Sequence, residues 1–403
     1  RNAHRKKEFF SKMAFFDFED EKPLVIDNGS CSLKAGWSGH GGPDVVLNSI
    51  VGRPRLESLR RVDPRLISSR AKGKFVGKEL EEIRGILSLQ RPVSHGKIKN
   101  WENWTLLMER VYDMLNAPME EHPVLVTMPR YNPTKNREKL VTELFENFGV
   151  PALYVAIPSV LCLYSSGRTT GLVIGCGDGL MHSDPISEGF ALHHASRTDI
   201  GGREATQGLA QLLREDGYRF STSAEREIVR DLKQKHAYVA LDYADAMKRS
   251  ISVQSKSSFE RDYVLPDGQV IKTGNALFRC MEGFFQPGFF GKETAGIHRL
   301  AFQNIQDAPR DSRKDLFKNI LLCGGSTMAP GFADRLRKEF DTLVDEYQLV
   351  NIKPNIIAPP EREQSVWIGG SILSSLSTFD QCWFTREEYD EHGVAGIYSK
   401  FQT

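Results

Sequence analysis

The chain of 403 residues has no excess of charge of either sign. Its 53 lysines and arginines balance 52 aspartates and glutamates, so no overall field favours nucleic acid or an anionic membrane surface. No apolar run approaches the ~20 residues that span a bilayer, and residues 1–7, Arg-Asn-Ala-His-Arg-Lys-Lys, lack the apolar segment of a secretory signal. We therefore expect no nucleic acid and no membrane as partners.

Cysteine is also sparse. The six cysteines lie far apart, and none belongs to a Cys-x-x-Cys pair. This spacing argues against a disulfide framework and a zinc site, and it is typical of a reducing compartment. Because the length exceeds what one hydrophobic core usually organises, we expect at least two domains in a soluble, intracellular protein. The cysteines are Cys31, Cys162, Cys176, Cys280, Cys323 and Cys382.

One stretch occurs twice. Residues 24–30 read Leu-Val-Ile-Asp-Asn-Gly-Ser, and residues 172–179 read Leu-Val-Ile-Gly-Cys-Gly-Asp-Gly. Each begins with an apolar run typical of a strand buried on both faces, and each ends in glycine and small polar residues that permit a tight turn. The backbone N–H groups of such a turn suit phosphate oxygens. Two ordinary hairpins are the plain alternative, but the duplication favours two related α/β halves that hold a polyanion between them.

A third apolar strand, residues 320–323, also ends in glycines. Gly324 and Gly325 permit close approach of the backbone to a flat ring or a ribose, a signal that gains weight as the third such turn. Periodicity and turn signals predict further elements along the chain. They are helices over residues 101–116, 133–148, 160–164, 203–217, 224–238 and 332–340, strands over residues 32–36 and 124–128, and a hairpin over residues 264–271.

Three segments lack a regular pattern. Residues 1–22 are charged and aromatic, and we expect a tail without regular structure. Residues 54–78 are basic and punctuated by proline and glycine, which predicts an exposed loop with short strands. The aromatic run over residues 284–290 is either buried under a neighbouring helix or an apolar plug for a partner.

Several long strings of residues occur in a specific order. They include Val51-Gly-Arg-Pro-Arg55, Arg84-Gly-Ile-Leu87, Gly167-Arg-Thr-Thr-Gly171, Ala224-Glu-Arg-Glu-Ile-Val-Arg-Asp231, Leu265-Pro-Asp-Gly-Gln269, Ile357-Ala-Pro-Pro-Glu-Arg362 and Val366-Trp-Ile-Gly-Gly-Ser-Ile-Leu373. All of them resemble actin, and the match runs over residues 23–398 with only local insertions. The sequence is therefore similar to that of a divergent actin or actin-related protein.

This resemblance implies the actin-like α/β fold, which Hsp70 ATPase domains and sugar kinases share. In that fold, two duplicated α/β halves divided into four subdomains clasp ATP or ADP, with Mg²⁺ or Ca²⁺, in the cleft between them. The implied organisation is an N-terminal extension over residues 1–22, subdomain 1 over 23–48, 92–165 and 365–403, subdomain 2 over 49–91, subdomain 3 over 166–200 and 293–364, and subdomain 4 over 201–292.

The resemblance also implies a set of site residues. The nucleotide phosphates would lie against Asn28, Gly29, Ser30, Cys31 and Lys34 on one side and Gly177, Asp178 and Gly179 on the other. The adenosine would lie against Arg230, Lys233, Gln234, Gly324, Gly325, Ser326 and Met328. Asp27 and Asp178 are the carboxylates that would hold waters on the cation.

Several departures from the actin pattern concern hydrolysis and affinity. Pro158 stands where actins carry a water-positioning glutamine, and proline has no side chain that can orient a water. Gly175 stands in place of an acidic group near the metal, and Cys31 replaces a glycine. Glu363 replaces a lysine near the base, which implies weaker nucleotide affinity. The resemblance thus implies nucleotide binding with poor hydrolysis, and no catalytic residue is assigned.

A cleft used by many actin-binding helices is the implied site for protein partners. The matching residues are Tyr164, Gly167, Arg168, Thr169, Leu373, Leu376 and Phe379. Packing of the domain alone would also account for these side chains. By contrast, residues 55–75 replace an actin assembly loop with a longer and more basic segment. This change implies either a dedicated partner or a filament that excludes ordinary actin.

Two functions follow as alternatives. The first is a structural subunit of the cytoskeleton or of a larger complex, with possible self-association and a nucleotide that clamps the two halves. The second is an ATP-hydrolysing, filament-forming actin. A small-molecule kinase of the same fold would need a base beside an acceptor pocket, and the sequence offers no candidate. The expected location is the cytoplasm and cytoskeleton, with a cilium or the nucleus as further options.

Overall fold

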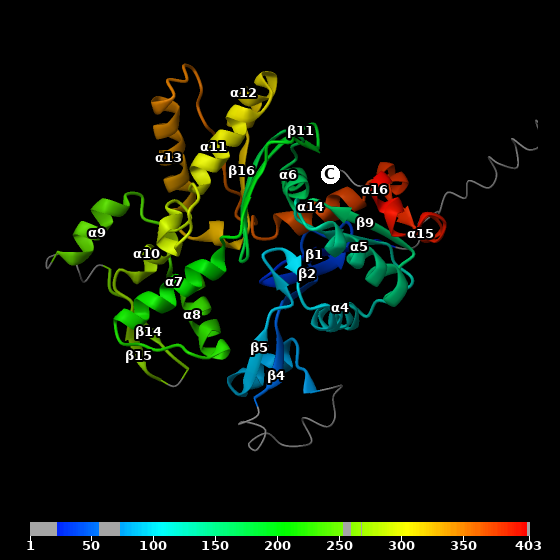
Figure 1. The fold of residues 1–403 in the computed structure, drawn as a ribbon, viewed down its shortest axis with the longest axis horizontal. Coiled ribbons are helices and arrows are strands. Elements are labelled where there is room, and N and C mark those ends of the chain that lie inside the picture. The colour runs from blue at the N-terminus through cyan, green and yellow to red at the C-terminus, as the bar shows by residue number, and fades with distance from the viewer. Residues whose placement is uncertain (1–21, 56–72, 253–258, 267, 401–403) are drawn as a thin grey trace, which may run out of the picture.

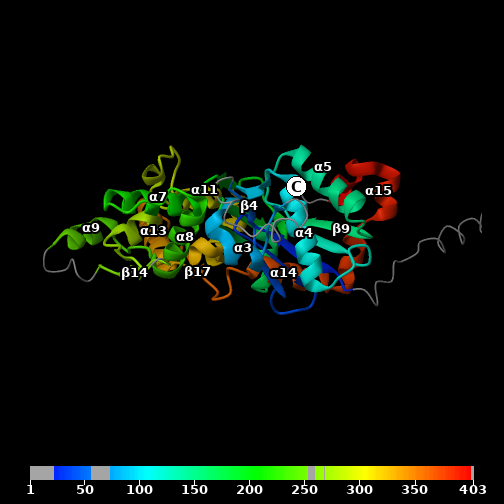
Figure 2. The same ribbon diagram turned by 90° about the horizontal axis from the view of Figure 1, so that it is seen from below.

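The structure is a computed structural model that describes residues 22–55, 73–252, 259–266 and 268–400. Residues 1–21 of the predicted tail over residues 1–22, and most of the basic loop over residues 55–75, lie outside the described residues. The chain forms two lobes side by side, and the molecule is thin when seen from below (Figures 1 and 2). Within the described ranges, no helix is long and apolar enough to cross a membrane.

The first lobe is built on a sheet with the strand order β18-β9-β8-β1-β2-β3. Its centre is buried because the apolar residues of β1 and β8 face helices on both sides of the sheet. Strand β1 runs antiparallel to β2 and parallel to β8. The strands are β1 (Leu24–Asn28), β2 (Ser32–Trp37), β3 (Val45–Asn48), β8 (Val124–Thr127), β9 (Ala152–Ala156) and β18 (Phe384–Thr385).

The second lobe repeats this pattern in a sheet with the order β12-β11-β10-β16-β17, and β13 pairs with β11. Strand β10 runs antiparallel to β11 and parallel to β16, as β1 does to β2 and β8. The predicted duplication is therefore confirmed, because both copies of the repeated stretch form the same strand in the same setting. The strands are β10 (Gly171–Cys176), β11 (Met181–Ser187), β12 (Phe190–Ala191), β13 (Ser196–Thr198), β16 (Ile320–Cys323) and β17 (Ile356–Ile357).

Several helices flank the first sheet, among them α14 (Ser365–Ser374), which is described below. Helix α4 (Trp101–Leu115) was expected from its apolar spacing, and the Asn100 side chain caps it by accepting from the Asn103 N–H at 3.0 Å. Helix α5 (Thr134–Thr142) begins after Pro133 and continues into a π-helical turn, η3 (Glu143–Asn147), so the predicted 133–148 helix is two helical segments. Helices α15 (Arg386–His392) and α16 (Ile397–Lys400) complete the lobe.

Helices of the second lobe cover its sheet and enclose a large apolar core. Of the predicted aromatic run, Phe284 and Phe285 are buried in that core, whereas Phe289 is about half exposed. Burial is therefore the reason for most of this aromatic load. The helices are α7 (Gly202–Glu215), α8 (Ser223–His236), α9 (Tyr243–Ile251), α10 (Ala276–Glu282), α11 (Ile297–Asp307), α12 (Arg310–Lys318) and α13 (Phe332–Glu346).

Each lobe also carries a small outer unit. Strands β4 (Val51–Pro54) and β5 (Leu87–Gln90) pair beside helix α3 (Lys78–Ile83) at the lower edge of the first lobe in Figure 1. In the second lobe, β14 (Asp262–Val264) and β15 (Val270–Lys272) form the predicted hairpin.

Two helices join the lobes, α6 (Pro158–Ser165) and α14 (Ser365–Ser374), which pack against each other at the centre of Figure 1. Their backbones meet at Gly369, where a Cβ would overlap the carbonyl of Leu161. Only glycine permits this separation, so the close crossing depends on a residue without a side chain.

Candidate nucleotide site

The turns that follow β1 and β10 meet at the base of a cavity of about 460 Å³ between the lobes. A Cβ at Gly179 would lie 2.8 Å from Ser30 Oγ and 2.8 Å from the backbone nitrogen of His95. The two turns are thus in direct contact, and position 179 has no room for a side chain. This meeting of duplicated turns is the arrangement that the sequence predicts for a polyanion site.

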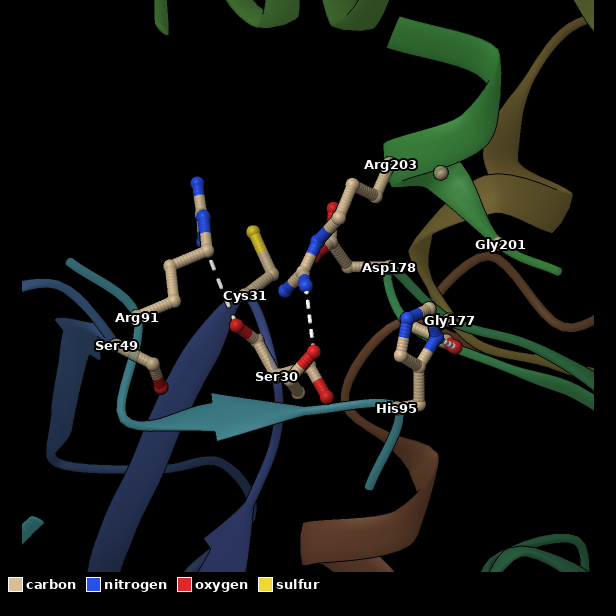
Figure 3. Close-up of polar contacts among 12 residues, drawn as sticks. Ser30, Cys31, Ser49, Arg91, His95, Gly177, Asp178, Gly201 and Arg203 are labelled. Atoms are coloured by element: carbon tan, nitrogen blue, oxygen red, sulfur yellow. Dashed lines mark hydrogen bonds and ion pairs between the residues drawn. The ribbon is translucent and has the colours of Figure 1, made fainter. Parts of the chain in front are cut away.

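Ser30 and Cys31 form the first turn, which neighbouring segments hold in place (Figure 3). Ser49 Oγ donates to the carbonyl of Gly29 at 2.8 Å, and the Gly96 N–H donates to Ser30 Oγ at 3.1 Å. Arg91 Nη1 lies 3.4 Å from the Ser30 carbonyl. These bonds fix the loop from outside, and both Ser30 and Cys31 line the cavity.

Asp27 and Asn28, at the end of β1, already have protein partners. Asp27 accepts from Thr127 Oγ1 at 3.0 Å with one oxygen and lies 3.3 Å from Lys34 Nζ with the other. The side-chain oxygen of Asn28 accepts from Trp104 Nε1 at 3.1 Å, so that group points toward α4. Asn28 lines the cavity, but its side-chain carbonyl is hydrogen-bonded to the buried Trp104 and not to a group in the cavity.

The second turn rests on the start of α7. The Gly202 N–H donates to the carbonyl of Gly177 at 2.9 Å, and the Arg203 N–H donates to that of Asp178 at 2.9 Å. Arg203 Nη2 lies 3.5 Å from the Asp178 carboxylate, and its Nη1 reaches across to Ser94 Oγ at 2.7 Å. Figure 3 shows this guanidinium between the two turns.

The end of β16 supplies the third wall. Gly324 has φ +89°, and a Cβ there would lie 2.5 Å from the Cys176 carbonyl. Ser326 Oγ donates to the Gly177 carbonyl at 2.9 Å, which ties this wall to the second turn. Met328, about one-third exposed, and Glu363 line the cavity beyond it.

The structure brings together nearly all the nucleotide residues that the sequence predicts. Every one lines the cavity except Arg230, whose Nη1 instead lies 3.1 Å from Cys31 Sγ. Pro158 also lines the cavity as the first residue of α6, a position that suits proline because the first helical N–H needs no partner within the helix. The chain departs from the actin pattern here without disturbing the helix.

Sequence reasoning missed a cluster behind the second turn, formed by Ser159, His182 and Asp184. His182 Nδ1 donates to Asp184 Oδ2 at 2.9 Å, Ser159 Oγ donates to the same carboxylate oxygen, and the imidazole lines the cavity. Burial alone would raise the pKa of Asp184, but hydrogen bonds from His182 and Ser159 and the charge of Arg130 lower it overall. The available signal was hairpin register, because His182 pairs with Gly175 across β10 and β11.

The side chains around the cavity do not fit a cation that is coordinated directly by the protein. Among the residues that the structure describes, no three His, Cys, Asp or Glu side chains are placed to hold a metal ion. Of the two predicted metal residues, Asp27 is paired with Lys34 and Asp178 with Arg203. All six cysteines are unpaired as well.

A second, smaller groove of about 210 Å³ lies between α6, α14 and the 3₁₀ helix η7 (Ser377–Cys382). Of the predicted partner residues, Tyr164, Leu373, Leu376 and Phe379 line it. The other three do not: Gly167 follows α6 as a left-handed residue, Arg168 bonds to Asn319 and Ser166, and the Thr169 carbonyl accepts from Gly189. The partner groove is therefore smaller than the sequence match implies.

Two matching α/β sheets whose first hairpins meet at a shared cavity define a two-lobed protein of the nucleotide-binding class. A family model described as Actin matches residues 18–402, and the chain belongs to the actin family. The predicted resemblance and the actin-like α/β fold are thus confirmed, and the protein is actin-like and belongs to a nucleotide-binding family.

Proposed function

We propose that the protein is an actin-like structural subunit that binds ATP or ADP in its cleft and hydrolyses it slowly or not at all. The observation that carries this proposal is the contact of the Ser30 and Gly179 turns at the base of the cavity. The turns of both lobes line the same cavity, so a polyphosphate placed there would contact both lobes at once. The nucleotide would then act as a clamp.

Slow hydrolysis follows from the chemistry of the phosphate end. In-line attack on a terminal phosphate requires a group that positions the water, and Pro158, which lines the cavity, has no hydrogen-bonding side-chain atom. The cleft is therefore better suited to holding a nucleotide than to turning it over.

The groove between α6 and α14 supports an interaction role. Leu376 is about half exposed at its rim, whereas Phe379 is buried against Tyr154 and Trp383 in its floor. An apolar floor with an exposed apolar rim suits the apolar face of an amphipathic helix. We place the protein in the cytoskeleton or in a larger assembly, with self-association as a further mode. The cytoplasm is the expected compartment, with a cilium or the nucleus as alternatives.

The proposal is tested by thermal unfolding of the purified protein with ATP, ADP, GTP or buffer alone. A ligand that binds only the folded state must raise the unfolding temperature, by several degrees when its concentration is ~100 times Kd. We expect stabilisation by ATP and ADP and a weaker effect of GTP. Equal unfolding temperatures in all four samples would contradict nucleotide binding.

A further inference from the structure

The position opposite His182 is closed to any side chain. A Cβ at Gly175 would overlap His182 Nε2, so an acidic residue at position 175 requires the imidazole to move. The ring is fixed at its other nitrogen, because Nδ1 donates to the Asp184 carboxylate at 2.9 Å. The imidazole therefore occupies the space that a third carboxylate would need at the phosphate end of the cavity.

The buried Asp184 carboxylate makes displacement of the His182 imidazole energetically unfavourable. The Asp184 side chain is 5% exposed, and its remaining partners are Ser159 Oγ and Arg130 Nη1, the latter at 3.9 Å. Moving His182 away would remove a hydrogen bond from a buried carboxylate, which is strongly unfavourable. Gly175 and His182 thus form a matched pair.

Three carboxylates line the cavity, and the two that lie at the turns are already neutralised. Asp27 lies 3.3 Å from Lys34 Nζ, and Asp178 lies 3.5 Å from Arg203 Nη2. A divalent cation would compete with these protein cations for the same oxygens. In the described part of the chain, no third carboxylate lines the phosphate end of this cavity.

Positive charge is also present beside the two turns. A Cβ at Gly202 would lie 2.9 Å from Lys233 Nζ and 3.5 Å from the Cα of Asp178, so Lys233, which the resemblance assigns to the adenosine, also lies near the second turn. Lys233 lines the cavity, donates to the Gly202 carbonyl at 2.5 Å, and makes no ion pair within the described ranges. Arg91 and Arg230, which contact the first turn, share the single carboxylate of Glu227 at 2.7 and 2.8 Å. Burial lowers the pKa of Lys233, and the charge of Asp178 opposes that effect. A polyphosphate would supply the anion that these groups lack.

We infer that this cleft binds the polyphosphate of an adenine nucleotide without a divalent cation. Lys233 in the cavity lining, with Arg91, Arg203 and Arg230 behind the two turns, would balance the phosphate charge. The inference rests on the proposed nucleotide binding and deepens it. His182 takes the space of a cation-holding acid, and the two acids at the turns, Asp27 and Asp178, are paired with Lys34 and Arg203. Free nucleotide, rather than its magnesium complex, is the ligand that this charge pattern fits.

The test is titration of the full chain with a fluorescent ATP analogue, once in excess Mg²⁺ and once in EDTA. We expect the two Kd values to agree within about threefold. Binding in Mg²⁺ that weakens about tenfold or more in EDTA would overturn the inference while leaving nucleotide binding intact. The absence of binding under both conditions would instead contradict the proposed function and the inference together.

Variants at position 233 test whether the Lys233 ammonium, rather than a metal ion, balances the phosphate charge. Lys233→Met should weaken binding in EDTA about tenfold or more, and Lys233→Arg should recover most of it. Lys235→Met is the matched control, because Lys235 lies on the same helix but is exposed and paired with Asp231. Equal affinities of the Lys233→Met and Lys235→Met proteins in EDTA would contradict the role of Lys233.

A second variant places an acidic side chain at position 175. In Gly175→Asp/His182→Ala/Asp184→Val, the imidazole and its buried carboxylate are removed together, so the new side chain has space. Arg130 loses its ion pair with Asp184 but keeps its hydrogen bond to the Leu192 carbonyl at 2.8 Å. We expect this protein to bind the analogue more tightly in Mg²⁺ than in EDTA. His182→Ala/Asp184→Val is its control and should remain indifferent to Mg²⁺; a preference for Mg²⁺ in that control would count against the inference.

Discussion

Arg91 and Glu227 join the two lobes across the cleft, with Arg91 Nη2 2.7 Å from Glu227 Oε1. Arg91 follows β5 in the first lobe, and Glu227 lies on α8 in the second. Both side chains are largely buried, and the Leu89 N–H beside them donates to Ser223 Oγ at 3.0 Å. This pair joins the lobes beside the first turn, because Arg91 Nη1 also lies 3.4 Å from the Ser30 carbonyl, and so would resist the separation of the lobes that release of the proposed nucleotide requires.

Arg91→Gln should therefore speed nucleotide release. Glu227 keeps Arg230 at 2.8 Å, so the loss is smaller than for a buried pair left without any partner. A double-mutant cycle with Glu227→Gln should give a coupling energy on the order of 1–2 kcal/mol. The measurement is the dissociation rate of a fluorescent nucleotide chased with excess ATP. Arg337→Gln, at an exposed pair on α13, is the control, and additive effects of the two cleft variants would exclude a bridging role.

Pro158→Gln should raise the rate of phosphate release but only partly. A glutamine at the first position of α6 retains the helix and supplies the missing side-chain donor and acceptor. A well-placed general-base or water-positioning group contributes roughly 10²–10⁴-fold, and we expect a smaller gain because Gly175 leaves the phosphate end without its acid. The wild-type rate should lie below that of conventional actin under identical conditions; an equal rate would refute slow hydrolysis.

Leu376→Asp should abolish binding of an amphipathic helical partner without unfolding the protein. Leu376 is 48% exposed, so a charge there costs little stability, typically within about 0.5 kcal/mol for surface changes. At the rim of an occupied apolar groove the same charge should cost about 2 kcal/mol of binding or more. The measurement is pull-down of partners paired with an unfolding curve. Val350→Asp, 81% exposed and outside the groove, is the control, and unchanged partner recovery with Leu376→Asp would leave the groove without this role.

His298 should make the second lobe sensitive to acid. Burial lowers its pKa to about 4, although the charge of Glu339 opposes the shift. The unfolded chain takes up this proton near ~6.5, so the folded state loses stability as the pH falls from about 6.5 to about 4. The loss is on the order of 2 kcal/mol for this group.

Urea unfolding at several pH values measures this effect. His298→Gln, which cannot titrate, should flatten the dependence between pH ~6.5 and ~4. His236→Gln, in the last turn of α8, offers a comparison on a histidine that is exposed. Identical slopes for the wild-type and His298→Gln proteins would show that His298 is not the acid-sensitive group.

The local patterns predicted the strands and most helices because burial and periodicity act over short stretches. The apolar runs of β1 and β10 are readable without any partner strand, and so is the buried face of α4. Helix ends were less predictable. The turn η3 shows why, since nothing local distinguishes a π-helical turn from a continuing α-helix when packing imposes it.

By itself, the sequence determined the duplicated strand and turn, most of the residues that line the cavity, and the proline at position 158, because these depend on residue type and order. Tertiary structure alone decided that Asp27 and Asp178 are neutralised by Lys34 and Arg203, and that the space beside Gly175 belongs to His182. Whether a charge is paired and whether a space is filled depend on side chains from distant parts of the chain. These contacts form only when the folded lobes bring those side chains together.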